Sequence, residues 1–91
     1  MENCDLIWEN KIIGAFTNIE MDMWYLDGKL SLNKTDKSKK FKKALLKLDS
    51  KGIFLNLNLG LKALLRPNKN SELNIIVISL DEENNFLVRT V

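Results

Sequence analysis

The stretch of residues 21–32 constrains the fold of this chain more than any other. Runs rich in apolar residues lie on both sides of Asp27-Gly28, a dipeptide that favours the two-residue type I′ turn of a β-hairpin. We therefore expect an antiparallel hairpin that turns at these two residues. The face expected to lie in the core carries Met21, Met23, Tyr25, Leu30 and Leu32.

The opposite face of this predicted hairpin is polar except for two side chains. It carries Asp22, Trp24, Leu26, Lys29, Ser31 and Asn33. An aromatic anchor beside a few polar groups is typical of the centre of a protein interface. Trp24, flanked by Asp22 and Leu26, is therefore the leading candidate for contact with a protein partner. The alternative is that another part of the chain covers this face.

Short runs rich in β-branched and aromatic residues predict the neighbouring strands. Residues 6–8 and 12–16 predict a first hairpin, and residues 17–20 look like a connection to the second. The first third of the chain would then form a four-stranded meander. Gly14 predicts a bulge, or a place where another side chain packs against bare backbone.

The second half of the chain predicts further strands. Residues 53–59 alternate as in a half-buried strand, and residues 73–80 are apolar on both faces, as in a central strand. Residues 86–91 form the last predicted strand. Residues 61–66 fit a strand or one helical turn, and we favour the strand because the segment is short and ends at a proline.

A single helical pattern interrupts these strands. The apolar stripe at helical spacing is made by Phe41, Ala44, Leu45 and Leu48. It predicts one amphipathic helix at about residues 36–49, with Gly52 as its C-terminal cap. The expected fold is α+β: a mostly antiparallel β-sheet of about six to eight strands with this helix packed on one face, in a single globular domain of residues 1–91. The strand order stays open.

The residue types exclude most catalytic and metal-binding chemistry. The chain contains no histidine and one cysteine, Cys4. The commonest general base and metal ligand are therefore missing, as are any internal disulfide and any multi-cysteine metal site. The acidic residues 81–83 lack the spacing of a calcium loop. We therefore expect no enzyme and no catalytic, cofactor-binding or metal-binding residues.

The sequence also indicates a cytoplasmic protein without a membrane partner. No apolar run approaches the roughly 18 to 20 residues that a membrane helix needs. The first five residues are acidic and are not followed by an apolar stretch, so they do not resemble a secretory signal.

Charge is distributed in three blocks along the chain. Residues 1–33 hold six acids and two bases, residues 34–69 hold two acids and eleven bases, and residues 70–91 hold four acids and one base. The net charge of +2 therefore hides a strongly basic middle between two acidic ends.

Most of the basic charge of the middle block lies in the predicted helix. Its lysines are Lys37, Lys39, Lys40, Lys42, Lys43 and Lys47. They fit three interpretations: the solvated face of an amphipathic helix, a surface that binds nucleic-acid phosphates, or a surface that steers an acidic protein partner. The helix contains no arginine and the lysines alternate with no exposed aromatic residue, which disfavours the nucleic-acid interpretation.

The first part of the chain resembles a group of small bacterial proteins. The resemblance is carried by Trp8, Ile13-Gly14, Thr17-Asn18, the run from Asp22 to Tyr25, and Gly28-Lys29. Some of these proteins are regarded as immunity proteins encoded beside polymorphic or contact-dependent toxins. The resemblance covers about the first 30 residues and extends to the closing strand through Arg89. The resemblance implies direct binding to a toxin, but it does not identify any residue of this chain as functional. The basic middle block of this chain departs from the acidic composition that is typical of immunity proteins against nucleases.

Together these observations predict a non-catalytic protein-binding domain, most concretely a bacterial immunity or inhibitor protein that neutralises a cognate toxin. The expected partner-binding residues are Asp22, Trp24, Leu26, Lys29, Lys39 and Lys43. A nucleic-acid-binding module that uses residues 37–47 is one alternative. A homo-oligomeric structural protein is another, with the Trp24 face or an edge strand as its self-interface.

Overall fold

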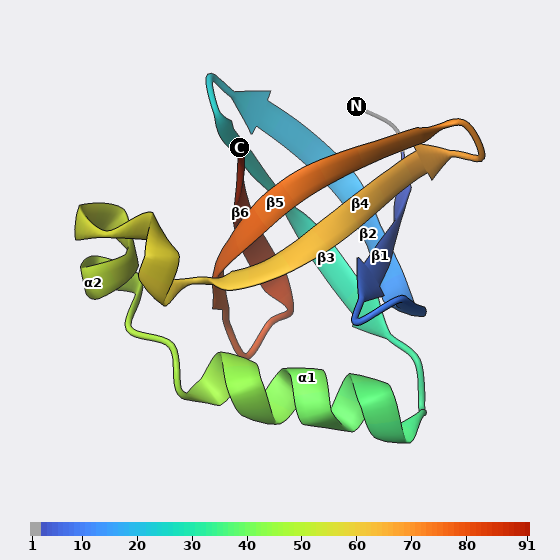
Figure 1. Ribbon diagram of the computed structural model, residues 1–91, viewed down its shortest axis with the longest axis horizontal. Helices are drawn as coiled ribbons and strands as arrows, with labels where there is room; N and C mark the ends of the chain where they lie inside the picture. Colours follow the sequence, from blue (N-terminus) through green and yellow to red (C-terminus); the bar gives the residue numbers. More distant parts are fainter. Residues whose placement is uncertain (1–2) are drawn as a thin grey trace.

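Six antiparallel strands form a closed barrel in the computed structural model, which describes residues 3–91 apart from the side chains of Ser50 and Phe54 (Figure 1). The strands are β1 (Cys4–Trp8), β2 (Lys11–Asp22), β3 (Tyr25–Leu32), β4 (Leu61–Asn68), β5 (Ser71–Leu80) and β6 (Asn85–Thr90). Their order around the barrel is β1-β2-β3-β6-β5-β4, with β4 paired to β1. The barrel thus consists of two three-stranded meanders, β1-β2-β3 and β4-β5-β6, which are joined by the pairs β3–β6 and β1–β4. The expectation of a mostly antiparallel sheet with six to eight strands is confirmed, and its closure into a barrel was not predicted.

The barrel interior is filled by every second side chain of each strand. On β3 the interior positions include Leu26 and Leu30, and on β5 they include Ile75 and Val77. The rings of Phe16 and Phe86 meet edge to face at the centre, with their centroids 5.1 Å apart. Residues 73–80 are indeed apolar on both faces because one face lies in the barrel and the other under a helix.

The predicted turn of the 21–32 hairpin is wrong. The chain turns at Met23 and Trp24, where Asp22 pairs with Tyr25, while Asp27 and Gly28 lie within β3. Gly28 serves a close approach instead of a turn. A Cβ atom there would lie 2.5 Å from the carbonyl oxygen of Thr17 and 2.9 Å from Cε1 of Phe16.

The predicted four-stranded meander is also wrong, because β2 runs through residues 17–20 without a connection. A β-bulge interrupts its pairing with β3 between Thr17 and Glu20, and Asn18 takes a left-handed φ of 53° there. The bulge predicted near Gly14 is present: Leu6 pairs with Gly14, whereas the next residue of β1 pairs with Ile12.

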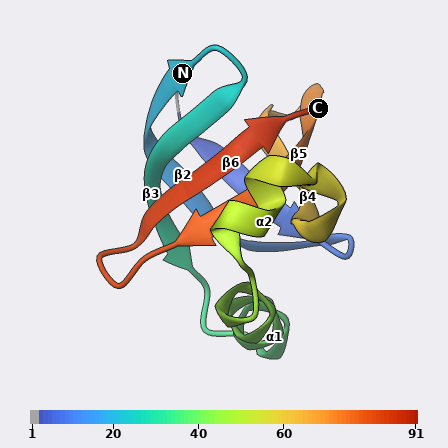
Figure 2. The same cartoon turned by 90° about the vertical axis from the view of Figure 1, so that its left-hand side faces the viewer.

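Helix α1 (Asp36–Leu46) closes one end of the barrel (Figure 2). It starts in a capping box between Thr35 and Ser38, and its buried Phe41 meets the ring of Trp8 with a centroid separation of 5.3 Å. The predicted amphipathic helix is therefore present. It ends three residues earlier than expected, with Lys47 as its C-cap, and covers the end of a barrel instead of the face of an open sheet.

The predicted strand at residues 53–59 is wrong, because this segment forms the short helix α2 (Ser50–Leu55) and the 3-10 helix η1 (Leu57–Leu59). The side chains of Asp49 and Asn56 cap the two helices by accepting hydrogen bonds from the backbone, which competes with strand pairing. Ile53 is buried on the outer side of β5. Gly52 lies inside α2 and does not cap α1.

Residues 61–66 lie in β4, so the strand interpretation of this segment is confirmed. Across the described residues, neither α1 nor α2 has the length and apolarity of a membrane-spanning helix.

Candidate binding surfaces

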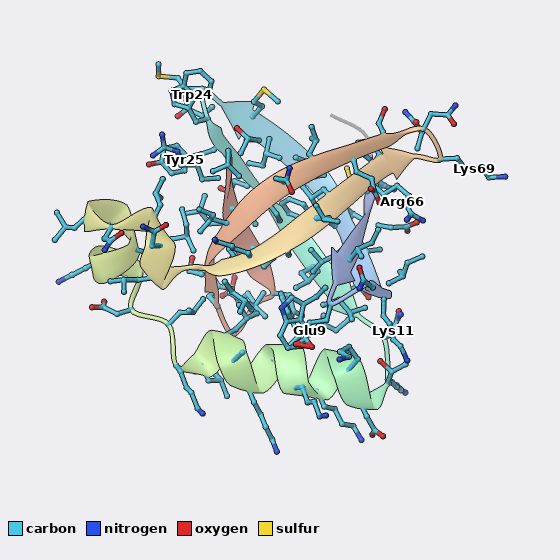
Figure 3. All side chains as sticks on the ribbon, in the orientation of Figure 1. Glu9, Lys11, Trp24, Tyr25, Arg66 and Lys69 are labelled. Atoms are coloured by element: carbon cyan, nitrogen blue, oxygen red, sulfur yellow. The ribbon has the colours of Figure 1, made fainter. Side chains whose placement is uncertain are left out.

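The turn between β2 and β3 exposes three large apolar side chains at the end of the barrel opposite α1 (Figure 3). Met21 is 56%, Met23 80% and Trp24 60% exposed. We refer to these three residues as the hairpin tip. Exposing so much apolar surface on one turn costs free energy in water, and such patches commonly mark interaction sites.

The backbone of the hairpin tip is held firmly although its side chains are free to make contacts. The carbonyl oxygen of Trp24 accepts hydrogen bonds from both the backbone N–H (2.8 Å) and the hydroxyl (3.1 Å) of Thr90 on β6. Met23 has a left-handed φ of 56°, which is unfavourable for a residue with a long side chain. Backbone strain of this kind is concentrated at functional sites, where the surrounding structure maintains it.

Acidic side chains surround the hairpin tip. Glu20, Asp22 and Asp27 are all exposed on the adjoining parts of β2 and β3. Asp22 thus lies next to Trp24, as expected. Leu26 does not, since it points into the barrel and is 0% exposed. Its assignment as a partner-binding residue is wrong, because β3 continues through Asp27-Gly28 and Leu26 therefore lies on the same face as Leu30, inside the barrel.

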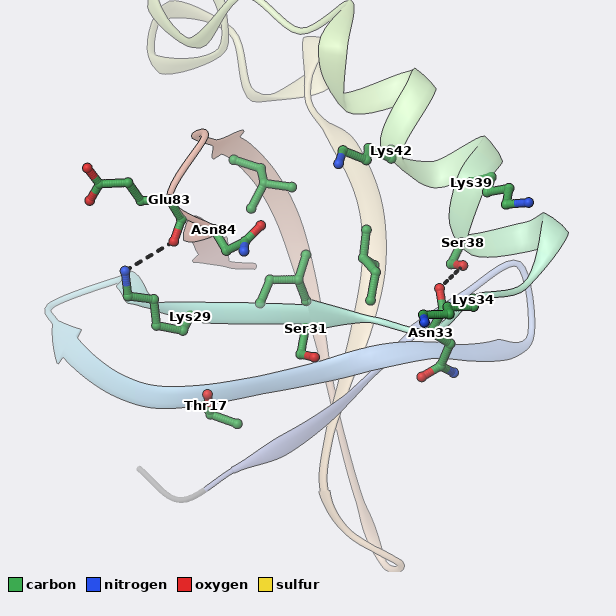
Figure 4. A pocket seen from close by; sticks show the side chains of 13 residues that line it. Thr17, Lys29, Ser31, Asn33, Lys34, Ser38, Lys39, Lys42, Glu83 and Asn84 are labelled. Atoms are coloured by element: carbon green, nitrogen blue, oxygen red, sulfur yellow. Dashed lines mark hydrogen bonds between the residues drawn. The ribbon is translucent and has the colours of Figure 1, made fainter.

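A second surface is a groove of about 670 Å³ near the other end of the barrel, between α1, β3 and the β5–β6 turn (Figure 4). It exists because two strands separate. The pairing of β3 with β6 ends at Lys29, whereas the pairing of β3 with β2 continues to Leu32. Four lysines line the opening: Lys29, Lys34, Lys39 and Lys42. We refer to it as the lysine groove.

Hydrogen bonds order both walls of the lysine groove. On the turn wall, the Asp81 carboxylate accepts from the backbone N–H groups of Glu83 (2.9 Å) and Asn85 (2.8 Å) and from the Asn85 amide (2.8 Å). The Asn85 side chain, followed by the backbone N–H groups, holds the pKa of Asp81 below its ordinary value. On the helix wall, the Ser38 hydroxyl donates to the carbonyl oxygen of Asn33 at the end of β3.

The structure brings together only some of the residues predicted to bind a partner. Lys29 and Lys39 lie in the same groove, whereas Lys43 is exposed on α1 outside it. Lys37 lies on the other flank of α1, where it pairs with Glu9 (2.9 Å) and lies 5.7 Å from the ring centroid of Trp8. Trp24 is at the opposite end of the barrel (Figure 3).

Two groove residues, Lys34 and Asn84, were not predicted from the sequence, and Lys42 was named only among the helix lysines and not as a partner-binding residue. Lys42 belongs to the lysine-rich helix and could have been selected by its spacing of three from Lys39. Lys34 and Asn84 have no comparable signal, since they join the groove only through the packing of α1 and the β5–β6 turn.

Among the described residues, no group of three or more Cys, Asp or Glu side chains could hold a metal ion. Comparisons with protein-family models, with curated proteins and with solved structures gave no match to this chain.

Proposed function

We propose that this protein is a non-catalytic protein-binding domain that contacts its partner through the hairpin tip. The observation that carries the proposal is the exposure of Met21, Met23 and Trp24 on a turn whose backbone is fixed by Thr90. Because the backbone of the turn is already ordered, binding costs little backbone entropy, and aromatic anchors such as Trp dominate the binding energy of protein interfaces.

The charge around the tip specifies the chemistry of the partner. Glu20, Asp22 and Asp27 surround the apolar side chains, so a complementary partner presents an apolar pocket with a basic rim. A toxin whose substrate site is basic fits this description. Together with the resemblance to toxin-immunity proteins, this supports the more specific proposal of a bacterial immunity protein that blocks a cognate toxin by direct binding.

Calorimetric titration against an inactivated toxin candidate, taken from the reading frame next to this gene, tests the proposal. The unmodified protein is expected to bind an inactivated toxin and, when produced together with the active toxin, to restore bacterial growth. Trp24→Ala removes the aromatic anchor and should weaken binding by about 2 kcal/mol or more, which is about a 30-fold rise in Kd.

Leu55→Ala is the matched control, because Leu55 is 91% exposed on α2, away from the tip. It also removes an exposed apolar side chain, and it should leave both affinity and growth rescue unchanged. A Trp24→Ala variant that binds at full strength would exclude the hairpin tip as the contact surface. Failure of the unmodified protein to bind would exclude this toxin as its partner.

A further inference from the structure

The lysine groove carries positive charge on both of its walls. Lys39 and Lys42 come from α1, and Lys29 lies on the opposite wall, where its Nζ donates to the carbonyl oxygen of Glu83 at 3.2 Å (Figure 4). Lys34 follows β3 at one end of the groove. An extended anion lying between the walls would therefore be within reach of ammonium groups on both sides.

Between the lysines the groove offers neutral hydrogen-bonding groups over an aliphatic floor. Ser31, Asn33 and Asn84 supply hydroxyl and amide groups of the kind that bind phosphate and sugar oxygens. Of the described lining residues, Glu83 alone is acidic, against four lysines. The lining is therefore suited to a ligand with repeated negative charges.

The residue types also define how such a ligand would be recognised. The described lining contains no arginine, which would read base edges, and no aromatic ring, on which bases would stack. Lysine ammonium groups bind phosphates as point charges and carry no sequence information. The groove therefore suits the backbone of a nucleic acid better than its bases.

Two features favour an extended single strand. The four lysines are distributed over both walls and one end of the groove, which favours a chain with repeated negative charges over a compact anion. A groove of about 670 Å³ has room for part of a single phosphodiester chain, whereas a duplex is too wide to enter it. We propose that the lysine groove binds single-stranded nucleic acid through its phosphate backbone, at a site distinct from the hairpin tip.

Fluorescence anisotropy with the full chain and a labelled oligothymidylate of about 12 nucleotides, within the usual range of site sizes, tests this proposal. Binding is expected at low salt, with log K falling linearly against log salt at a slope of about −3 for four neutralised phosphates. The double substitution Lys39→Gln and Lys42→Gln should raise Kd at least tenfold and reduce the steepness of the slope by about 1.4.

The double substitution Lys40→Gln and Lys43→Gln is the matched control, since it removes the same charge from the same helix outside the groove. It should change Kd less than threefold. If both double variants lost oligonucleotide affinity equally, binding would be explained by diffuse electrostatic attraction to α1 and not by the lysine groove. Circular dichroism and urea midpoints establish that both variants are folded, so that a loss of binding reports on the groove.

Competing ligands decide the ligand class. Displacement of the oligonucleotide by polyglutamate at equal charge concentration would overturn the proposal in favour of an acidic polypeptide, and tighter binding of a duplex would overturn the single-strand assignment. Absence of binding at low salt would overturn it altogether. Trp24→Ala should leave oligonucleotide affinity unchanged, so this test and the toxin-binding test can fail independently.

Discussion

At the scale of single residues, Gly28 and Trp24 show how packing in the barrel determines what the surface displays. Gly28 allows β2 and the ring of Phe16 to approach β3 closely. The strand therefore continues through Asp27-Gly28, and Leu26 becomes an interior residue. The turn falls instead on Met23 and Trp24, which leaves both side chains in solvent.

We expect Gly28→Ala to destabilise the protein by about 1–3 kcal/mol, because the added methyl would overlap the Thr17 carbonyl and the Phe16 ring. Urea unfolding measures the difference. Gly52→Ala is the control: its Cβ would meet only the movable side chains of Asp49 and Leu59, and alanine is preferred to glycine in a helix by up to about 1 kcal/mol. Equal stability of the Gly28→Ala variant and the unmodified protein would contradict the close contact within the barrel.

The same residues show the limit of prediction from sequence. Asp-Gly between alternating apolar residues is a strong local turn signal, and no local pattern reports that a phenylalanine ring lies against this glycine. Met-Trp has no turn propensity of its own. Trp24 is exposed, which is one of the two interpretations that the sequence left open for its face. Leu26 was assigned to the wrong face, since the uninterrupted strand puts it on the same side as Leu30.

At the scale of secondary-structure elements, α1 forms the base of the barrel. Phe41 packs between Trp8 and Phe86, with ring-centroid distances of 5.3 and 6.5 Å. The same helix supplies one wall of the lysine groove. The helix is thus a structural element on its buried side and a candidate binding surface on one exposed flank.

Phe41→Ala should lower the free energy of unfolding by about 3–5 kcal/mol, because it leaves a cavity beneath α1 that the aromatic neighbours cannot fill. Leu46→Ala on the same helix should change it by no more than about 0.5 kcal/mol, since Leu46 is 78% exposed. Urea denaturation followed by circular dichroism compares the two variants. Similar losses in both would mean that α1 does not seal the barrel through its buried stripe.

The elements were predicted best where their signals are local. The apolar stripe and capping residues of α1 are contained within its own sequence, and the strands β4 to β6 were also identified. The α2–η1 segment was not, because Ile53 is stabilised by Ile76 and Ile78 on the outside of β5. The lysine groove was only partly predicted for a similar reason. It depends on where β3 separates from β6, which follows from closure of the barrel.

At the scale of the whole molecule, barrel closure and charge asymmetry limit how copies of this protein can associate. Each strand pairs with two neighbours in the described barrel, so the edge-strand interface considered from the sequence has no free edge to use. Two other routes are contact between hairpin tips, and attraction between the acidic surroundings of one tip and the lysine groove of another molecule.

We expect neither route to yield a stable oligomer at physiological salt. The hairpin tip is a small apolar patch surrounded by like charges, so two tips facing each other would bring Glu20, Asp22 and Asp27 of both molecules together. Contact between a tip and a groove would rest on exposed charges that salt screens over about 8 Å. Light scattering should therefore give the monomer mass of 10.5 kDa. A dimer that persists in salt and is lost in Trp24→Ala would instead make the tip a self-interface, and it would remove the main support for a toxin partner.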